Sequence, residues 1–296
     1  MSTKQRILLQ LDTDPRPSTF DAIVAVDGGA QVILPYGGVR PENVRDLIYG
    51  AIFTRSPDSL RSTAVFIGGS DIRLGEEVLA AARSAFIGPL SVSILLDSNG
   101  ANTTAAAAVL NARDDLASKG RGLEGVRAAV LAGTGPVGRR VVKLLARSGA
   151  QVIVGSRSLD RAEAVVREVA GAVPGATLEP AAMTSESETQ ARLEGVELVI
   201  AAGGAGVVLL PLETRRSLSA LRVAIDLNAV PPAGIEGVGV TDVAVERDGV
   251  SCHGAIGVGG RKMRIHRAAI GSLFEANDRN LDAEEILAIG AALPAS

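Results

Sequence analysis

A glycine-rich segment, Gly133-Thr134-Gly135-Pro136-Val137-Gly138, is the strongest pattern in this chain. It follows an apolar run of strand length and precedes a run with the spacing of an amphipathic helix. In that context Gly133 permits a tight turn, Gly135 lets the backbone approach a pyrophosphate, and Gly138 lets the helix pack against the strand. Free N–H groups at the helix N-terminus would bind the phosphates. The segment therefore predicts a dinucleotide-binding βαβ unit, with a turn of purely structural purpose as the alternative.

The end of the next strand distinguishes NADP from NAD. An NAD site usually has an Asp or Glu about 20 residues after the first glycine, where it binds the ribose hydroxyls. This chain has Gly155-Ser156-Arg157-Ser158 there, with two hydroxyls and no acid to repel a 2′-phosphate. The guanidinium of Arg157 either stacks on the adenine or pairs with that phosphate. We therefore predict NADP as the cofactor. Arg161 either adds to the phosphate site or is solvated, and Asp160 is interpreted as a first-turn acid of the following helix.

The ends of later strands are expected to frame the nicotinamide, because ligands of a doubly wound sheet bind beyond the carboxyl ends of its strands. Ala201, Ala202 and Gly203 end one apolar run, and such small residues either permit the close approach of a flat ring or form a tight loop. Asn228 ends another run and precedes two prolines. Its side chain binds the carboxamide, which we favour, or fixes its own turn.

Composition narrows the range of partners. The 296 residues include 30 Lys and Arg against 33 Asp and Glu, and no basic run is present. We therefore expect no nucleic acid and no membrane as partner, and small molecules instead. The apolar stretch near the N-terminus is too short for a signal peptide or a membrane span, which favours a cytoplasmic protein.

The few reactive side chains limit the chemistry. A single cysteine, Cys252, excludes an internal disulfide, and two histidines, His253 and His266, argue against a metal site. We interpret all three as structural. Because motifs for a serine nucleophile, a zinc protease and a Tyr-Lys dehydrogenase are absent, an enzyme of this sequence needs little side-chain acid or base chemistry.

Apolar runs of strand length alternate with helical patterns, which predicts an α/β fold with largely parallel sheets. The expected strands are 6–12, 30–36, 62–69, 90–97, 196–204 and 221–232, and residues 126–158 are expected to form a strand, the glycine-rich turn, a helix that ends at Gly149, and a second strand. The other expected helices are 18–27, 41–52 with a proline in its first turn, 71–86, an alanine-rich helix after residue 98, 158–170, 268–276 and 282–293. We predict a substrate domain of residues 1–105 plus 268–296, a Rossmann-type NADP-binding domain of residues 106–267, and a cleft between them.

Several segments resemble the NADP-dependent methylene-tetrahydromethanopterin dehydrogenases of methylotrophic bacteria, over essentially the whole chain. They are LDTDPRPSTFD (11–21), LDSNGANTTAAAA (96–108), AGTGPVG (132–138), DLNAVPPAGIEG (226–237), GAIGVGGRKMRIHRA (254–268) and DAEEI (282–286). The resemblance implies hydride transfer to NADP+ from the methylene carbon of a reduced pterin, tetrahydromethanopterin and also tetrahydrofolate. It also implies a two-domain subunit that assembles into a trimer or hexamer.

This reaction suits a chain without acid–base motifs. A methylene carbon between two nitrogens loses hydride directly, because the resulting cation is delocalised over both nitrogens. No proton has to leave the reacting carbon, so the protein mainly positions the donor and the acceptor.

The resemblance also indicates residues on the substrate side. Lys262 matches a lysine of the family, and we expect it to orient the pterin in the active site, unless it belongs to a solvated cationic face. Asp97, Asn102 and Thr103 match the DSNG-NTT segment and either bind the pterin or cap a helix. Phe20 either stacks on the pterin or fills the core, which we favour.

Two other functions fit parts of the pattern. A shikimate-type dehydrogenase would need a catalytic Lys-Asp pair in the first domain, whose only lysine is Lys4. A non-catalytic NADP-binding sensor would use the same fold without turnover. Formation of NADPH from a methylene pterin distinguishes an enzyme from a sensor.

Overall fold

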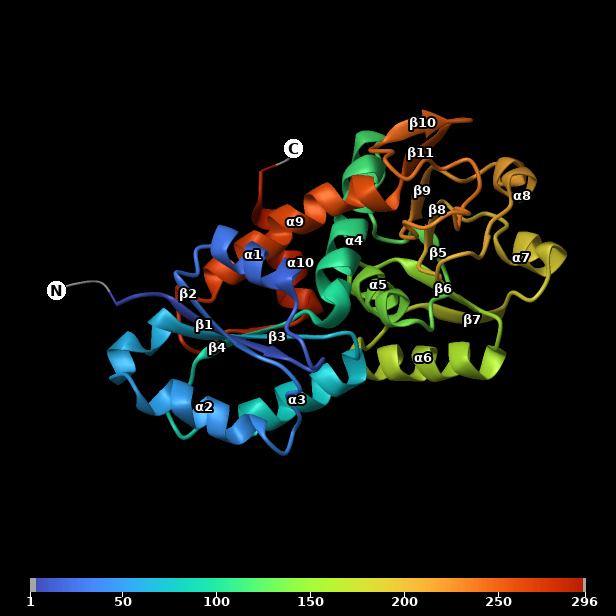
Figure 1. Cartoon of the computed structure of the whole chain (residues 1–296). Helices are drawn as coiled ribbons and strands as arrows, with labels where there is room; N and C mark the ends of the chain where they lie inside the picture. The colour runs from blue at the N-terminus through green and yellow to red at the C-terminus, as the bar shows by residue number, and fades with distance from the viewer. Residues whose placement is uncertain (1–3, 295–296) are drawn as a thin grey trace. The chain divides into compact units, whose positions relative to one another are not determined.

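A computed structural model describes residues 4–294, and Figure 1 shows the course of the chain. The chain divides into two compact units. Unit 1 runs up to Thr103 and continues from Met263, and unit 2 is Thr104–Lys262. The sequence pattern places these boundaries after residues 105 and 267. The boundaries fall inside two long helices, α4 (Ala101–Ser118) and α9 (Ala255–Ser272), so no loop marks them in the sequence.

Unit 1 contains a parallel sheet with the strand order β12-β4-β3-β1-β2. Its strands are β1 (Ile7–Asp12), β2 (Val32–Tyr36), β3 (Thr63–Gly68), β4 (Ser93–Leu96) and β12 (Asn280–Leu281). The helices are α1 (Thr19–Asp27), α2 (Val44–Phe53), α3 (Ile72–Ser84) and α10 (Ala283–Ala292), with short 3-10 turns at Pro57–Ser62 and Ser98–Gly100. Figure 1 shows α2 and α3 on one face of this sheet and α1 and α10 on the other.

The core of unit 1 lies between the sheet and the helices α2 and α3. Leu9, Val65 and Ile94 from the strands pack with Ile48 of α2 and Val78 of α3, and all of these side chains are buried. Burial of each such side chain contributes about 1.5–3 kcal/mol to folding. The buried apolar runs therefore account for the parallel sheet that the sequence predicts.

One helix start in unit 1 differs from the prediction. Helix α2 begins at Val44 with Asn43 at its N-cap, so Pro41 is not in its first turn. The side chain of Asn43 accepts a hydrogen bond from the backbone N–H of Arg40 at 2.8 Å. Residues 40–43 therefore form a separate turn before the helix.

Unit 2 contains a seven-stranded sheet with the order β10-β11-β9-β8-β5-β6-β7. Its strands are β5 (Arg127–Leu131), β6 (Gln151–Ser156), β7 (Leu178–Ala182), β8 (Leu198–Ala201), β9 (Val223–Asp226), β10 (Val245–Arg247) and β11 (Val250–His253). The helices are α5 (Pro136–Arg147), α6 (Leu159–Ala172), α7 (Glu186–Arg192) and α8 (Leu212–Ser217). Only β10 is antiparallel to its neighbour among the described strands.

The direction of the chain reverses beside β5. The strands β6 and β7 follow on one side of β5, and β8 and β9 lie on the other side. This is the doubly wound arrangement, and its ligand site lies at the reversal point, beyond the carboxyl ends of the strands. The predicted α/β class with a Rossmann-type unit is confirmed.

The predicted strand 221–232 and helix 268–276 are wrong in extent. Strand β9 ends at Asp226, and a helix already begins at Ala255. Glycines lower the helix propensity of the start of α9. Gly257 is needed there, because a Cβ atom at this position would lie 1.9 Å from the carbonyl oxygen of Asp242. Close packing against that backbone overrides the propensity.

Candidate functional site

The glycine-rich turn connects β5 to α5 and is fixed by backbone hydrogen bonds. Ala132 has a positive φ of 54°, and the N–H of Gly133 donates to the carbonyl of Gly155 at 2.9 Å. A Cβ atom on Gly138 would lie 2.6 Å from the carbonyl oxygen of Ala132. The predicted packing role of Gly138 is therefore confirmed.

Gly135 differs from Gly138, because the fold does not need a glycine there. A Cβ atom on Gly135 would meet only the carbonyl oxygens of Ala132 at 3.4 Å and Ala202 at 3.7 Å, which are ordinary contacts. The space in front of Gly135 is thus open, as a bound pyrophosphate requires.

The N-terminus of α5 has no side-chain cap. Pro136 occupies the first turn and has no N–H group. The N–H groups of Val137 and Gly138 find no acceptor among residues 4–294. These donors and the positive end of the helix dipole form a site for an anion directly after Gly135.

The end of β6 lies beside this turn. The hydroxyl oxygens of Thr134 and Ser156 are 3.4 Å apart, and Ser156 Oγ accepts the N–H of Ser158 at 3.2 Å. Ser158 caps α6 by accepting the N–H of Arg161 at 3.4 Å. The Ser158 oxygen is therefore already engaged, whereas its O–H can still donate.

Two cations stand at this strand end. Arg157 and Arg161 are exposed, and neither guanidinium forms a hydrogen bond or ion pair within the described chain. The structure thus places the predicted phosphate-binding groups beside the turn, with no carboxylate paired to them. The residues present fit a dinucleotide that carries an additional phosphate.

The ends of β8 and β9 lie on the other side of β5. Ala202 is directed towards the turn, since its carbonyl oxygen is the one that faces Gly135. A Cβ atom on Gly203 would lie 2.6 Å from Leu209 Cδ1. Gly203 is therefore small because Leu209 packs over it, which supports the loop interpretation for this residue.

The hydrogen bonds of Asn228 support the alternative interpretation, in which its side chain fixes its own turn. Its Nδ2 group donates to the carbonyls of Val230 and Pro232, both at 2.8 Å, and its Oδ1 accepts the N–H of Val230 at 3.0 Å. Both N–H groups of the side-chain amide thus bind carbonyls of its own turn. No donor of this amide is left for a carboxamide.

Asp226 is a buried acid that the sequence analysis does not identify. It ends β9, is 2% exposed, and accepts three backbone N–H groups of the following loop. Burial raises the pKa of its carboxyl above the ordinary value, although these three hydrogen bonds act in the opposite direction. The only sequence signal is an acid at the end of an apolar strand.

The predicted site residues of the DSNG-NTT segment are buried in unit 1. They are Asp97, Asn102 and Thr103. Asp97 Oδ1 accepts the N–H groups of Asn102 at 2.9 Å and Thr103 at 3.0 Å, and its Oδ2 accepts the hydroxyl of Thr103 at 2.6 Å. Asn102 donates to the carbonyl of Leu96 at 2.6 Å and to Asp282 at 2.9 Å. The structure therefore supports the capping interpretation for this segment.

Phe20 is 52% exposed, so the favoured core role is wrong. It lies on the outer face of α1 together with Ile23 and Val26, which are also exposed. Only Val24 and Ala25 of this helix are buried. The helix is apolar on both faces, which is why its sequence does not indicate the buried side.

Lys262 lies in the middle of α9 and is half-buried. Its neighbour Arg261 pairs with Asp114 at 2.6 Å and donates to Asn111 at 3.1 Å, and Arg264 donates to the carbonyl of Pro294 at 2.5 Å. The interpretation of this segment as a solvated cationic face is therefore wrong for Arg261, whose side chain is 16% exposed.

The cysteine and both histidines are buried, which agrees with their interpretation as structural residues. Cys252 is fully buried, and burial raises the pKa of its thiol to about 11. His253 Nε2 lies 2.7 Å from Asp115 Oδ2, and His266 stacks on Phe66 with ring centroids 5.6 Å apart. Among residues 4–294 no three His, Cys, Asp or Glu side chains group as metal ligands.

No helix of the described chain has the length and apolarity to cross a membrane.

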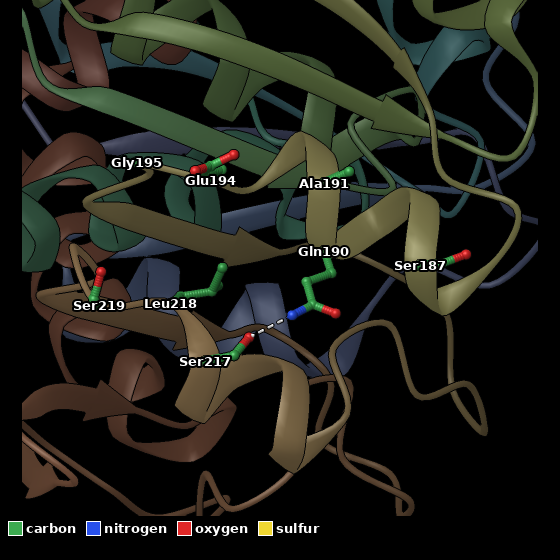
Figure 2. A pocket seen from close by; sticks show the side chains of 8 residues that line it. All are labelled: Ser187, Gln190, Ala191, Glu194, Gly195, Ser217, Leu218 and Ser219. Carbon is green, nitrogen blue, oxygen red and sulfur yellow. Dashed lines mark hydrogen bonds between the residues drawn. The ribbon is translucent and has the colours of Figure 1, made fainter.

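A pocket of about 430 Å³ lies elsewhere in unit 2, between α7 and the end of α8 (Figure 2). Gln190 Nε2 donates to Ser217 Oγ at 3.1 Å across it. Its lining residues are Ser187, Gln190, Ala191, Glu194, Gly195, Ser217, Leu218 and Ser219. None of the predicted site residues lines this pocket, and it contains no cation for a phosphate.

A doubly wound sheet with an uncapped glycine-rich turn places unit 2 in the class of Rossmann-type dinucleotide-binding domains. The family profile described as "Methylene-tetrahydromethanopterin dehydrogenase, N-terminal" matches residues 19–99. The bifunctional protein MdtA of Methylorubrum extorquens is 43% identical over 283 residues, which cover 95% of this chain and 96% of that protein. The chain therefore belongs to the methylene-tetrahydromethanopterin dehydrogenase family, which confirms the resemblance.

Two further proteins are similar. The NAD(P)-dependent methylenetetrahydromethanopterin dehydrogenase of the same organism is 32% identical over 88% of this chain and 89% of that protein. A structure of aspartate transcarbamoylase from Trypanosoma cruzi has a TM-score of 0.50 at 13% identity, covering 94% of this chain and 86% of that chain. At this identity the second likeness concerns the fold alone.

Proposed function

We propose that the protein oxidises the methylene bridge of methylene-tetrahydromethanopterin to the methenyl form and passes the hydride to NADP+. The observation that carries the proposal is the open space at Gly135 in front of an uncapped helix, in a chain of this family. Gly135 is not required by the packing, so its small size is explained by the approach of a ligand.

Each end of the site has a distinct task in this proposal. The N–H groups of Val137 and Gly138 bind the pyrophosphate, and Arg157 with Arg161 binds the 2′-phosphate. Ser156 and Thr134 hold these two parts of the site together through their contact. NADP+, when bound, supplies the carbon that accepts the hydride. The preference for NADP over NAD rests on the two arginines and on the absence of an acid at the strand end.

The substrate side follows from the chemistry. The hydrogen leaves the methylene carbon as hydride, together with both electrons of the C–H bond. No proton is exchanged, so the protein needs no general base. Positive charge develops on the substrate, and a cation close to it would oppose the reaction. We assign Lys262 to a hydrogen bond with a carbonyl or carboxylate of the pterin away from the reacting carbon. Asp97, Asn102 and Thr103 contribute by fixing the start of α4.

Two finer points belong to this proposal. Methylene-tetrahydrofolate is proposed as a second substrate, because the resemblance of the DSNG-NTT segment implies it. Assembly into a trimer or hexamer follows from the family resemblance and is measured by light scattering after size-exclusion chromatography.

The test is an assay of NADPH formation with each methylene pterin, followed by near-ultraviolet absorbance and run in parallel with NAD+. We expect turnover with methylene-tetrahydromethanopterin and NADP+. The Gly135→Val variant serves as the control, because its side chain fills the pyrophosphate site. Binding of NADP+ without turnover on either pterin would favour the non-catalytic sensor instead.

A further inference from the structure

Asp226 has an unusual environment for an acid. Its side chain is buried, and no cation forms an ion pair with it within residues 4–294. Its Oδ1 accepts the N–H of Asn228 at 3.0 Å, and its Oδ2 accepts the N–H groups of Gly234 at 2.7 Å and Ile235 at 3.1 Å. One carboxylate thus accepts hydrogen bonds from both ends of the loop 227–235. Burying a charged acid without a cation costs free energy of folding. A role of the loop shape that this acid imposes would explain why the protein bears that cost.

The loop shape is transmitted to the end of β8. The carbonyl of Gly234 accepts the N–H groups of Leu209 at 2.8 Å and Leu210 at 3.0 Å. Leu209 in turn fills the space beside Gly203, where a Cβ atom would lie 2.6 Å from its Cδ1. The same point beside Gly203 is 3.7 Å from the Cβ atom of Ala132, in the glycine-rich turn. A series of hydrogen bonds and packing contacts therefore leads from Asp226 through Leu209 to Gly203, beside the glycine-rich turn.

The strand order fixes which part of a dinucleotide this edge receives. Asp226 lies opposite Ala201 in the pairing of β9 with β8, and both strands end at the same edge. The strand β6, with the two arginines, lies on the opposite side of β5. If the 2′-phosphate binds at β6, the nicotinamide half extends towards β8 and β9.

We propose that Asp226 is a positioning residue that shapes the ends of β8 and β9 to receive the nicotinamide half of NADP+. The inference rests on the proposed use of NADP and does not depend on which substrate is oxidised. An asparagine in place of Asp226 carries no charge and has one oxygen where the carboxylate has two, so its NH2 group faces backbone N–H donors at one end of the loop. The loop then loses one of its two attachments, which weakens the support for Leu209 beside Gly203.

The test compares two ligands by isothermal titration calorimetry in the absence of any pterin. One ligand is NADP+, and the other is adenosine 2′,5′-bisphosphate, which lacks the nicotinamide half. In Asp226→Asn we expect the affinity for NADP+ to fall about tenfold or more, because charge-assisted hydrogen bonds are lost. The affinity for the bisphosphate should stay within about twofold, since its site is at β6.

Asp242→Asn is the matched control. Asp242 is also a buried acid of unit 2, and it pairs with Arg247 and accepts the N–H of Gly239 outside this chain of contacts. We expect both ligands to bind Asp242→Asn as they bind the wild type. If Asp226→Asn does not fold, Leu209→Ala replaces it, because this variant interrupts the same contacts without removing a charge. Its expected pattern is the same loss for NADP+ alone.

Three results would overturn the inference. Equal losses for both ligands in Asp226→Asn would indicate general structural damage, and unchanged NADP+ affinity would show that the loop does not reach the cofactor. Failure of the wild type to bind NADP+ would remove the proposed cofactor and the inference together. Absence of pterin oxidation with normal NADP+ binding would contradict the proposed function and leave the inference standing.

Discussion

The N–H of Gly133 donates to the carbonyl of Gly155 at 2.9 Å, and this bond attaches the glycine-rich turn to the end of β6. The two segments that we assign to the pyrophosphate and the 2′-phosphate are therefore held in one backbone frame. The contact between Thr134 and Ser156 supports the same frame through side chains. Changes on one segment should accordingly alter cofactor binding more than they alter the fold, unless they disturb this frame.

Gly135 and Gly138 should respond differently to substitution. Gly135→Val fills the open space at the turn, so NADP+ binding should be lost while the melting temperature changes little. Gly138→Ala places a Cβ atom 2.6 Å from the Ala132 carbonyl oxygen, and we expect a destabilisation of about 1–3 kcal/mol. Thermal unfolding and calorimetric binding of both variants check this. Unchanged affinity in a folded Gly135→Val protein would contradict the assignment of the turn.

Arg157 should select for the 2′-phosphate. Arg157→Ala should weaken NADP+ binding by about 1.5–3 kcal/mol, because a charge-assisted contact is lost, and should leave NAD+ binding nearly unchanged. Arg167→Ala on the exposed side of α6 is the control, since its ion pair with Glu163 is on the surface. Equal losses for NADP+ and NAD+ would show that the phosphate is not bound at Arg157.

Much of the fold could be predicted because the buried strands are continuous apolar runs. Strands β1 and β3 lie within one residue of the predicted 6–12 and 62–69. The edge strand β7 was missed, because Leu178–Ala182 is half-buried and contains a glutamate and a proline. The β10–β11 hairpin was missed although Asp248-Gly249, both at positive φ, provide a hairpin turn signal.

The site could be predicted only where backbone geometry determines the role. The glycine-rich turn requires particular residues at particular spacings, so its sequence is informative. Asn228 and Asp97 are polar residues at strand ends, and such residues bind either a ligand or a neighbouring N–H or carbonyl group. In both cases the nearby backbone is the partner, which depends on the path of the loop and not on residue type.

Lys262 is expected to act in substrate binding. If it orients the pterin in the ground state, Lys262→Ala should raise KM severalfold and leave kcat largely unchanged. Because hydride transfer needs no proton donor, turnover should persist above the background rate. Lys119→Ala is the control, as Lys119 pairs with Glu246 on the surface of unit 2. Normal kinetics with both pterins in Lys262→Ala would contradict the assignment.

Cys252 should be unreactive in the folded protein. Burial raises its thiol pKa to about 11, so the thiolate that reacts with disulfide reagents is scarce at pH 8. We expect no labelling of the native protein by a thiol-reactive chromophore within minutes, and complete labelling in guanidinium chloride. Rapid labelling under native conditions would show that β11 opens readily.

Asp115 should make the stability of unit 2 sensitive to acid. Burial acts to raise its pKa, but hydrogen bonds from His253 and Ser251 outweigh burial and hold the pKa below the ordinary value of 3.8. An acid with a lowered pKa in the folded state contributes stability above its unfolded pKa, and this contribution is lost as the pH falls through the folded value. The loss should therefore occur below about pH 4.

Asp115→Asn removes the charge and leaves Ser251 and His253 with a weaker acceptor. We expect a loss of about 1–3 kcal/mol at pH 7 and a flatter dependence of stability on pH below about pH 4, measured by urea unfolding across that range. Asp58→Asn, at an exposed position of the Pro57–Ser62 turn of unit 1, is the comparison variant. If Asp115→Asn retained the wild-type slope in acid, the titration of Asp115 would not contribute to the acid sensitivity of the fold.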